Sequence, residues 1–246
     1  MVALRVLWNM RPRRRSLQGM TATLITGANR GLGYETARRL LAEGHDVWVG
    51  ARDPERGRAA AERLGARFVA LDVTDDASVA KAVETVGALD VLVNNAGISG
   101  GFLPVSEITP AVFEEVFATN LFGVVRVTQA FLPLLERSAN PVIVNVSSAM
   151  GSIGITTDPE RIESTVAGLH YPSSKAALNM LTTQYAKALP GIRVNAVDPG
   201  WTATDFNERR GRKTVQQGAE VIVRMALLDR TGPTGAFVGE EGPLPW

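Results

Sequence analysis

Tyr171 and Lys175 lie four residues apart in the sequence Y-P-S-S-K, at the start of an apolar run. On a helix this spacing places both side chains on one face. An ammonium group near a phenol stabilises the phenolate, which helps a tyrosine with an ordinary pKa of about 10 to donate and recover a proton near neutral pH. The same spacing arises by chance in many helices, so the pair needs support from other parts of the chain.

A glycine-rich turn, T-G-A-N-R-G-L-G, spans residues 26–33 and joins a predicted strand to a predicted helix. Small residues let the backbone approach a pyrophosphate, and the N-terminus of the following helix stabilises its charge. A tight strand–helix turn without a ligand uses the same residue types, but the strand–turn–helix context favours dinucleotide binding. A dinucleotide beside a proton donor is the minimum equipment for hydride transfer to a carbonyl.

The end of the second predicted strand indicates which dinucleotide is bound. NAD-binding folds place a carboxylate there for the ribose hydroxyls, whereas the 2′-phosphate of NADP requires a cation. In this chain Ala51 takes the place of the acid, Arg52 follows it, and Arg30 lies in the glycine turn. Asp53 precedes Pro54, as expected for an ordinary helix cap. NADP is therefore the predicted cofactor, and the alternative for Arg52 is a solvated surface side chain.

The elements that must position these residues alternate along the chain. Apolar, β-branched runs predict strands at residues 21–26, 46–50, 67–71, 89–93, 141–146, 193–197 and 235–238. Helical periodicity predicts helices at residues 32–43, 54–64, 76–86, 108–135, 171–189 and 215–228. Strands without clean alternation, separated by helices, indicate a parallel sheet covered on both faces. The prediction is an α/β fold, a single doubly wound Rossmann domain with a mostly parallel seven-stranded sheet.

Composition excludes several other classes of protein. The 246 residues are 45% apolar and 21% charged, enough for one domain with a core, and they include no cysteine. His45 and His170 are the only imidazoles, so no metal site is expected. No apolar stretch reaches the length of about 18 residues that a membrane span needs.

Charge is unevenly distributed. Five of the 26 basic residues fall in residues 1–20, which hold no acid, so the rest of the chain carries a net charge of −4 and a nucleic-acid surface is not expected. Residues 1–19 are interpreted as a disordered basic extension, with the domain spanning residues 20–246. The alternative is a targeting or anion-binding arm, although the segment lacks the apolar core of a secretory signal.

Three further motifs follow predicted strands: N-N-A-G at residues 94–97, N-V-S-S at residues 145–148 and D-P-G-W-T-A-T at residues 198–204. All of them fall at carboxyl ends of strands, where open α/β sheets bind ligands. Together with the glycine turn and the Y-P-S-S-K segment, this set resembles the short-chain dehydrogenase/reductase family. The resemblance covers roughly residues 20–246 and rests on five motifs in the family's order.

The resemblance implies site residues. The implied catalytic set is Asn120, Ser148, Tyr171 and Lys175. Ser148 is preferred over Ser147 because the family pattern places a glycine three residues later, where Gly151 stands. The implied cofactor contacts are Gly27, Asn29, Arg30, Gly31, Leu32, Gly33, Arg52, Asp72, Val73, Asn95, Ala96, Gly97, Tyr171, Lys175, Pro199, Gly200, Thr202 and Thr204. Among them, Asp72 and Val73 correspond to the family's adenine contact. Thr202 and Thr204 correspond to the loop that holds the nicotinamide carboxamide.

Within that family, G-A-R-D-P-E-R-G and G-P-T-G-A-F-V-G-E-E-G look like the NADP-dependent carbonyl reductases. The 23-residue interval between Ser148 and Tyr171 is longer than is common in the family, though shorter than in its best-known carbonyl reductases. The extra stretch, residues 155–170, is polar and has little periodicity. It is expected to be either a flap over the substrate or a surface loop.

The expected function is an NADP-dependent oxidoreductase that transfers hydride between NADPH and a ketone or aldehyde, with Tyr171 as general acid. The alternatives are an alcohol dehydrogenase working in the oxidative direction and a non-catalytic NADP-binding regulator. We expect a cytoplasmic protein with a small-molecule carbonyl or alcohol substrate and no nucleic-acid or membrane partner, and we leave homo-oligomer formation open. The roles of two further sets of residues each have two possible interpretations. The aromatic set, pocket wall or core, is Phe102, Trp201 and Phe206; the basic set, anion contact or solvated loop, is Arg209, Arg210, Arg212 and Lys213.

Overall fold

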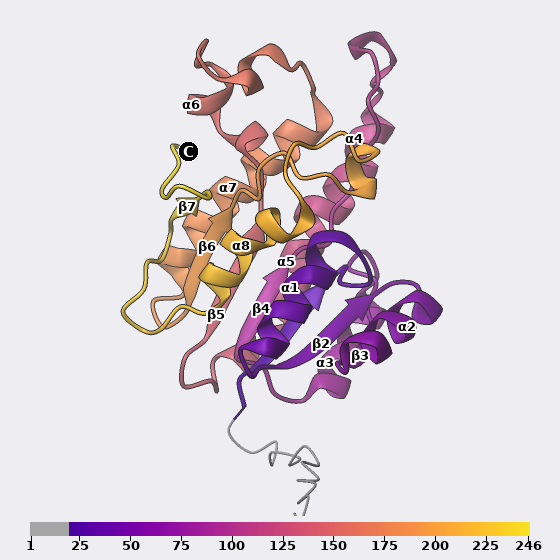
Figure 1. The fold of residues 1–246 in the computed structure, drawn as a ribbon, viewed down its shortest axis with the longest axis vertical. Coiled ribbons are helices and arrows are strands. Elements are labelled where there is room, and N and C mark those ends of the chain that lie inside the picture. Colours follow the sequence, from indigo (N-terminus) through magenta and orange to yellow (C-terminus); the bar gives the residue numbers. More distant parts are fainter. Residues whose placement is uncertain (1–19) are drawn as a thin grey trace, which may run out of the picture.

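Seven parallel strands form one sheet in the computed structural model, which describes residues 20–246 (Figure 1). The expectation of a disordered extension at residues 1–19 lies outside the described residues. The strands are β1 (Ala22–Thr26), β2 (Asp46–Ala51), β3 (Arg67–Ala70), β4 (Val91–Asn94), β5 (Val142–Val146), β6 (Arg193–Val197) and β7 (Phe237–Val238). Their order in the sheet is β3-β2-β1-β4-β5-β6-β7, and every pair is parallel. This confirms the predicted doubly wound fold, with a sheet that is wholly rather than mostly parallel.

The helices cover both faces of the sheet. They are α1 (Gly31–Ala42), α2 (Pro54–Leu64), α3 (Asp76–Val86), α4 (Pro110–Phe117), α5 (Gly123–Leu135), α6 (Ile153–Thr156), α7 (His170–Ala188) and α8 (Val215–Ala226). Side chains of α1, α2 and α8 pack with one set of strand residues, and side chains of α3, α5 and α7 pack with the other set. Consecutive strand residues point to opposite faces of the sheet. Because helices cover both faces, residues of both orientations are buried, and the strands are continuous apolar runs in the sequence.

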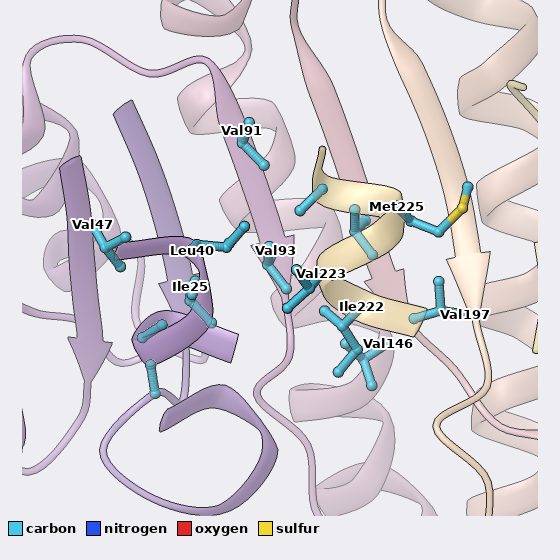
Figure 2. Packing of buried hydrophobic residues seen from close by; sticks show 14 of the residues in the cluster. Ile25, Leu40, Val47, Val91, Val93, Val146, Val197, Ile222, Val223 and Met225 are labelled. Atoms are coloured by element: carbon cyan, nitrogen blue, oxygen red, sulfur yellow. The ribbon is translucent and has the colours of Figure 1, made fainter. Parts of the chain in front are cut away.

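The central strands show this two-sided burial directly. Ile25 and Val93 face α1 and α8, as Figure 2 shows, while the adjacent Leu24 and Leu92 face α3 and α5. All four side chains are fully buried. The two apolar layers fix the sheet, and the sheet fixes where each strand ends.

Local signals set the ends of several helices as the sequence predicted. Asp53 caps α2, because its Oδ1 accepts hydrogen bonds from the backbone amides of Glu55 at 3.0 Å and Arg56 at 3.1 Å. Pro54 occupies the first helical position, and Gly65 ends the helix with a left-handed φ of 69°. The carboxylate that follows β2 is therefore engaged in capping.

The long helical stretch predicted at residues 108–135 is interrupted. A π-helical turn, η2 (Ala118–Phe122), separates α4 from α5 and carries the buried Asn120. Such turns within α-helices often occur at functional sites. By length and composition the whole stretch, Pro110–Leu135, is also apolar enough to cross a membrane, but 44% of its most apolar window is buried inside the fold.

Short elements that the sequence did not predict lie in the connections. Besides α6 and η2, they are the 3-10 turns η1 (Val105–Glu107), η3 (Ala149–Gly151), η4 (Ile162–Thr165) and η5 (Asp205–Asn207). The stretch before α4 and the stretch around α6 project from the same end of the molecule (Figure 1). Both ends of the supposed loop at residues 155–170 are buried: Ile155 packs with Ala149 and Phe237, and His170 begins α7.

Candidate active site

The sequence-predicted site residues gather at the carboxyl edge of the sheet. The glycine turn follows β1, Arg52 follows β2, Asn95 follows β4, Ser148 follows β5 and Pro199 follows β6. The neighbouring strands β1 and β4 connect to strands on opposite sides of the sheet, which places the topological switch point between them. Ligands of open α/β sheets bind in the crevice at this point.

The glycine turn packs closely against the segment after β4 at the start of α1. A Cβ on Gly33 would lie 2.6 Å from Asn95 Nδ2, and one on Gly27 would lie 3.0 Å from Ala96 Cα, so neither position accommodates a side chain without movement. Among residues 20–246, no side chain caps the N-terminus of α1, and the first turn of this helix contains no acid. Unpaired amides at a helix N-terminus suit a pyrophosphate. The residues present therefore fit a dinucleotide.

Hydrogen bonds tie the glycine turn to the segment after β4. The Thr26 hydroxyl accepts from the backbone amides of Asn95 at 3.0 Å and Ala96 at 2.9 Å. The Asn95 side chain donates in return to the Thr26 carbonyl at 2.8 Å. These contacts hold the two walls of the crevice at a fixed separation.

The two candidate cations differ in their surroundings. Arg52 is exposed at the end of β2, next to the buried Ala51, and makes no hydrogen bond or ion pair with the residues that the structure describes. Arg30 forms an ion pair with Asp205 at 3.2 Å. The sequence offered no sign of this ion pair between Arg30 and Asp205.

The remaining predicted cofactor contacts line the same edge. Asp72 Oδ1 accepts from the Thr74 amide at 2.9 Å, and the Val73 carbonyl accepts from Arg126 at 2.8 Å. After β6, the Thr202 hydroxyl is buried and donates to the Pro199 carbonyl at 3.2 Å. These contacts shape the turns at both ends of the crevice.

Tyr171, Lys175 and Ser148 come together beside this crevice. Lys175 Nζ lies 5.7 Å from the centroid of the Tyr171 ring and donates to the Val146 carbonyl at 2.8 Å. Burial raises the pKa of Tyr171 above its ordinary value, while its hydrogen bond with Ser148 lowers it and the Asp198 carboxylate raises it. Burial also lowers the pKa of the Lys175 ammonium to about 8. The expected lowering of the tyrosine pKa by the lysine is not among these effects, and the phenol stays protonated.

The two adjacent serines have different partners. Ser147 is buried, and its hydroxyl donates to Asn179 Oδ1 at 2.5 Å. Ser148 is partly exposed, and its oxygen accepts from the Met150 amide at 3.2 Å. Ser148 is the serine that faces the phenol, whereas Ser147 fastens the end of β5 to α7.

Asn120 is fully buried and its side chain is fully engaged. Its amide nitrogen donates to the Ile98 carbonyl at 2.9 Å and to Ser174 Oγ at 3.1 Å, and its Oδ1 accepts from the Ile98 amide at 2.9 Å. A Cβ on Gly97 would lie 3.3 Å from Asn120 Oδ1 and 3.8 Å from Lys175 Nζ. The asparagine thus lies close to the lysine, but its side chain holds protein groups.

Two neighbours of the phenol were not predicted to lie there. Phe206 packs edge-on against Tyr171 with ring centroids 5.4 Å apart. The Asp198 carboxylate accepts from the Gly200 amide at 3.1 Å, and burial raises its pKa. The D-P-G motif was visible in the sequence, but nothing in it indicated that the carboxylate lies near Tyr171.

The aromatic and basic sets have specific surroundings. Phe102, Trp201 and Phe206 are exposed by 65%, 49% and 38%, so the core alternative for them is wrong. Each residue of the basic set has a partner. Arg209 pairs with Asp205, Arg210 with Glu208 and Lys213 with Glu240, and Arg212 lies over the Trp201 ring. These partners leave the basic set less available for an anionic substrate.

Comparisons with known proteins agree with this geometry. The sequence profile described as short chain dehydrogenase matches residues 21–215. The chain is 37% identical to (+)-neomenthol dehydrogenase of Arabidopsis thaliana over 282 aligned positions, which cover 89% of this chain and 95% of the relative. It is 32% identical to carbonyl reductase [NADPH] 1 of Mus musculus, with 91% and 97% covered. The structure of NADPH-bound carbonyl reductase from chicken fatty liver superposes with a TM-score of 0.81 at 32% identity, covering 92% of this chain and 99% of that one.

Proposed function

The chain belongs to the short-chain dehydrogenase family, and from that premise we propose that it is an NADP-dependent reductase of ketones or aldehydes with Tyr171 as the proton donor. Membership of this family makes the protein an oxidoreductase that uses a nicotinamide cofactor. The choice of NADP, the direction and the roles of individual residues are parts of the proposal.

One observation carries the proposal. Tyr171 has Ser148 at its hydroxyl and the Lys175 ammonium 5.7 Å from its ring, beside a glycine turn whose helix N-terminus is uncapped. A protein that only bound a dinucleotide would need the turn but not a buried lysine next to a protonated phenol. The buried lysine is unfavourable for folding, which supports a functional reason for its presence.

The proposed mechanism assigns one task to each side chain. A bound nicotinamide cofactor supplies the hydride. The Ser148 hydroxyl donates a hydrogen bond to the substrate oxygen, and Tyr171 donates the proton that this oxygen gains. Burial keeps the phenol protonated, which is the form that a general acid requires. Lys175, with a pKa of about 8, is mostly charged at neutral pH, and it restores the proton of the tyrosine and orients the cofactor ribose.

Asn120 has a supporting task in this proposal. Its side-chain nitrogen is already occupied by Ile98 and Ser174, so a water that links Lys175 to solvent would bind the Asn120 backbone. The π-helical turn at residues 118–122 disturbs the regular helical hydrogen bonds at this point. The side chain then serves to hold the turn in place.

The preference for NADP rests on three side chains. Ala51 offers no carboxylate to the ribose, and Arg52 is exposed and unpaired among the described residues. Arg30 lies in the glycine turn, directly before α1. The mouse relative and the chicken structure are both described with NADPH. A guanidinium binds a phosphate through two parallel hydrogen bonds. A cytoplasmic location and a small-molecule substrate belong to the same proposal.

The substrate is proposed to be an apolar carbonyl compound. Phe206 packs edge-on against the Tyr171 ring. Phe102 and Trp201 are also exposed, and each lies under an arginine of the loop after β6. An (+)-neomenthol dehydrogenase and a salutaridine reductase are among the relatives, at 37% and 32% identity. Ligand pockets are lined mainly by hydrophobic and aromatic side chains, so these three aromatic residues suit an apolar substrate.

An NADPH-oxidation assay with a panel of ketones and aldehydes tests this proposal. We expect turnover with NADPH and little with NADH. Removal of a charge-assisted phosphate contact costs about 1.5–3 kcal/mol, so Arg52→Ala should weaken NADPH binding by roughly 10- to 150-fold and leave NADH binding unchanged. Arg137→Ala removes an exposed arginine that follows α5, ahead of β5 at the opposite edge of the sheet, and serves as the control. Equal use of both cofactors, or no turnover with any carbonyl, would overturn the proposal.

A further inference from the structure

Arg30 is bound by a carboxylate from a distant part of the chain. Its Nη1 lies 3.2 Å from Asp205 Oδ2, although the two residues are 175 positions apart in the sequence. The Arg30 and Asp205 side chains are 64% and 46% exposed, so the pair is accessible to ions and to ligands. The glycine turn and the loop after β6 therefore meet through this pair.

The loop holds the Asp205 carboxylate in place. Asp205 begins the turn η5, which is closed by a hydrogen bond from the Thr204 amide to Asn207 Oδ1 at 3.2 Å. Asn207 in turn donates to the Thr202 carbonyl at 2.9 Å. The turn touches the glycine segment, since a Cβ on Gly31 would lie 3.7 Å from the Thr204 methyl. The carboxylate thus reaches Arg30 from a fixed base.

The same carboxylate has a second cationic partner. Arg209 Nη2 lies 3.3 Å from Asp205 Oδ1, so each carboxylate oxygen faces one guanidinium. Glu208 and Arg209 adopt left-handed backbone conformations, with φ of 54° and 62°. Non-glycine residues rarely adopt this conformation, and it lets the chain turn back so that Arg209 reaches Asp205.

We propose that Asp205 is a specificity-determining residue for the cofactor, because it occupies the guanidinium of Arg30 that the 2′-phosphate of NADP would otherwise bind. This inference rests on the proposed preference for NADP. A carboxylate and a phosphate bind a guanidinium through the same donors, so the two compete. Asp205 lowers the affinity for NADP(H) and leaves the affinity for NAD(H), which carries no 2′-phosphate, unchanged.

Asp205→Asn tests the competition, because it removes the charge and keeps the size of the side chain. An exposed ion pair contributes little, so we expect NADPH to bind about two- to fivefold more tightly. NADH affinity should not change. Both dissociation constants are measured on the full chain by calorimetric titration without substrate, so the readout does not depend on turnover.

Glu208→Gln is the matched control. It removes the same charge from the neighbouring residue, which pairs with Arg210 rather than with Arg30. A general effect of negative charge on anionic cofactors would appear in both variants and with both cofactors. The competition affects only Asp205→Asn, and only with NADPH.

Arg30→Ala completes the test as a double-mutant cycle. On the Arg30→Ala background, Asp205→Asn should no longer change NADPH affinity. If wild type prefers NADPH and Arg30→Ala weakens that preference, but Asp205→Asn has no effect, the competition is wrong while the proposed cofactor stands. If wild type shows no preference for NADPH, the proposed cofactor fails and this inference fails with it.

Discussion

Tyr171 shows how a single residue depends on its surroundings. Its pKa is raised by burial, and only the Ser148 hydroxyl acts in the opposite direction among the larger influences. A protonated phenol is suited to reduction, in which the substrate oxygen takes a proton. The raised pKa of Tyr171 therefore supports the proposed reductive direction near neutral pH.

The two serines at the end of β5 provide a matched pair of variants. Ser148→Ala removes the hydroxyl next to the phenol, so kcat should fall by about 10- to 100-fold with little change in NADPH affinity. Ser147→Ala removes a buried hydrogen bond to Asn179, so it should lower the free energy of unfolding by about 1–3 kcal/mol and leave kcat nearly unchanged. Steady-state kinetics and denaturant unfolding of both variants measure these effects. A reversed pattern would mean that the assignment of the catalytic serine is wrong by one residue.

At this scale the sequence predicted residue types better than contacts. The motifs placed Tyr171, Lys175 and Ser148 at strand and helix ends, and the structure brings them together. Contacts between distant residues were not predictable, because nothing in the sequence near Arg30 indicates a partner 175 residues away. The edge contact of Phe206 with Tyr171 was hidden for the same reason.

The segment that joins Ser148 to Tyr171, which includes α6, is the element most suited to select substrates. It begins beside Ser148 and ends at Tyr171, and its first part is anchored to the C-terminal segment. Ser152 Oγ donates to the Pro245 carbonyl at 2.7 Å, and the Gly154 amide donates to the Trp246 carbonyl at 3.3 Å. Long connections at active sites often act as lids.

Two exposed apolar residues on this connection, Ile162 and Val166, are candidates for substrate contact. The double variant Ile162→Ser, Val166→Ser should raise KM for bulky apolar ketones by about five- to tenfold, the equivalent of about 1–1.4 kcal/mol of apolar contact. KM for a small ketone and the Kd for NADPH should stay the same. Leu227→Ser, an exposed change just beyond the end of α8, is the control. Unchanged KM values for both ketones would make the connection a surface loop only.

Periodicity predicted the long elements and missed the short ones. The helix at Asp76–Val86 and the strand at Arg193–Val197 have the predicted bounds, because capping residues and turns mark their ends. Elements of three to five residues, such as α6 and η5, are too short to show a period of 3.6. The π-helical turn at Ala118–Phe122 was missed because one extra residue per turn does not alter an apolar pattern visibly.

The buried lysine affects the free energy of unfolding of the whole molecule. Lys175 is 6% exposed, and its pKa of about 8 lies below the 10.5 of an unfolded chain. Below pH 8 both states carry the proton, and the folded state has a buried charge. Between pH 8 and 10.5 the unfolded state binds more protons, so the free energy of unfolding gains from this group as pH rises.

Comparison with Lys175→Met isolates this effect. Relative to the variant, wild type without cofactor should gain up to about 3 kcal/mol of unfolding free energy between pH 8 and 10.5. Denaturant unfolding across this range measures the difference, and groups shared by both proteins cancel. Lys187→Met, which removes an exposed lysine of the same helix, should show no such trend. A pH-independent difference for Lys175→Met would mean that the lysine is not buried in its charged form.

The turnover of Tyr171→Phe, measured with its NADPH affinity, tests the central claim most directly. The substitution keeps the ring against Phe206 and removes only the hydroxyl that is proposed to donate the proton. We predict a kcat for carbonyl reduction lower by about 10²–10⁴, the usual contribution of general acid catalysis, with an NADPH dissociation constant within about twofold of wild type. Near-wild-type turnover by Tyr171→Phe would contradict the account, because the proton would then come from another group.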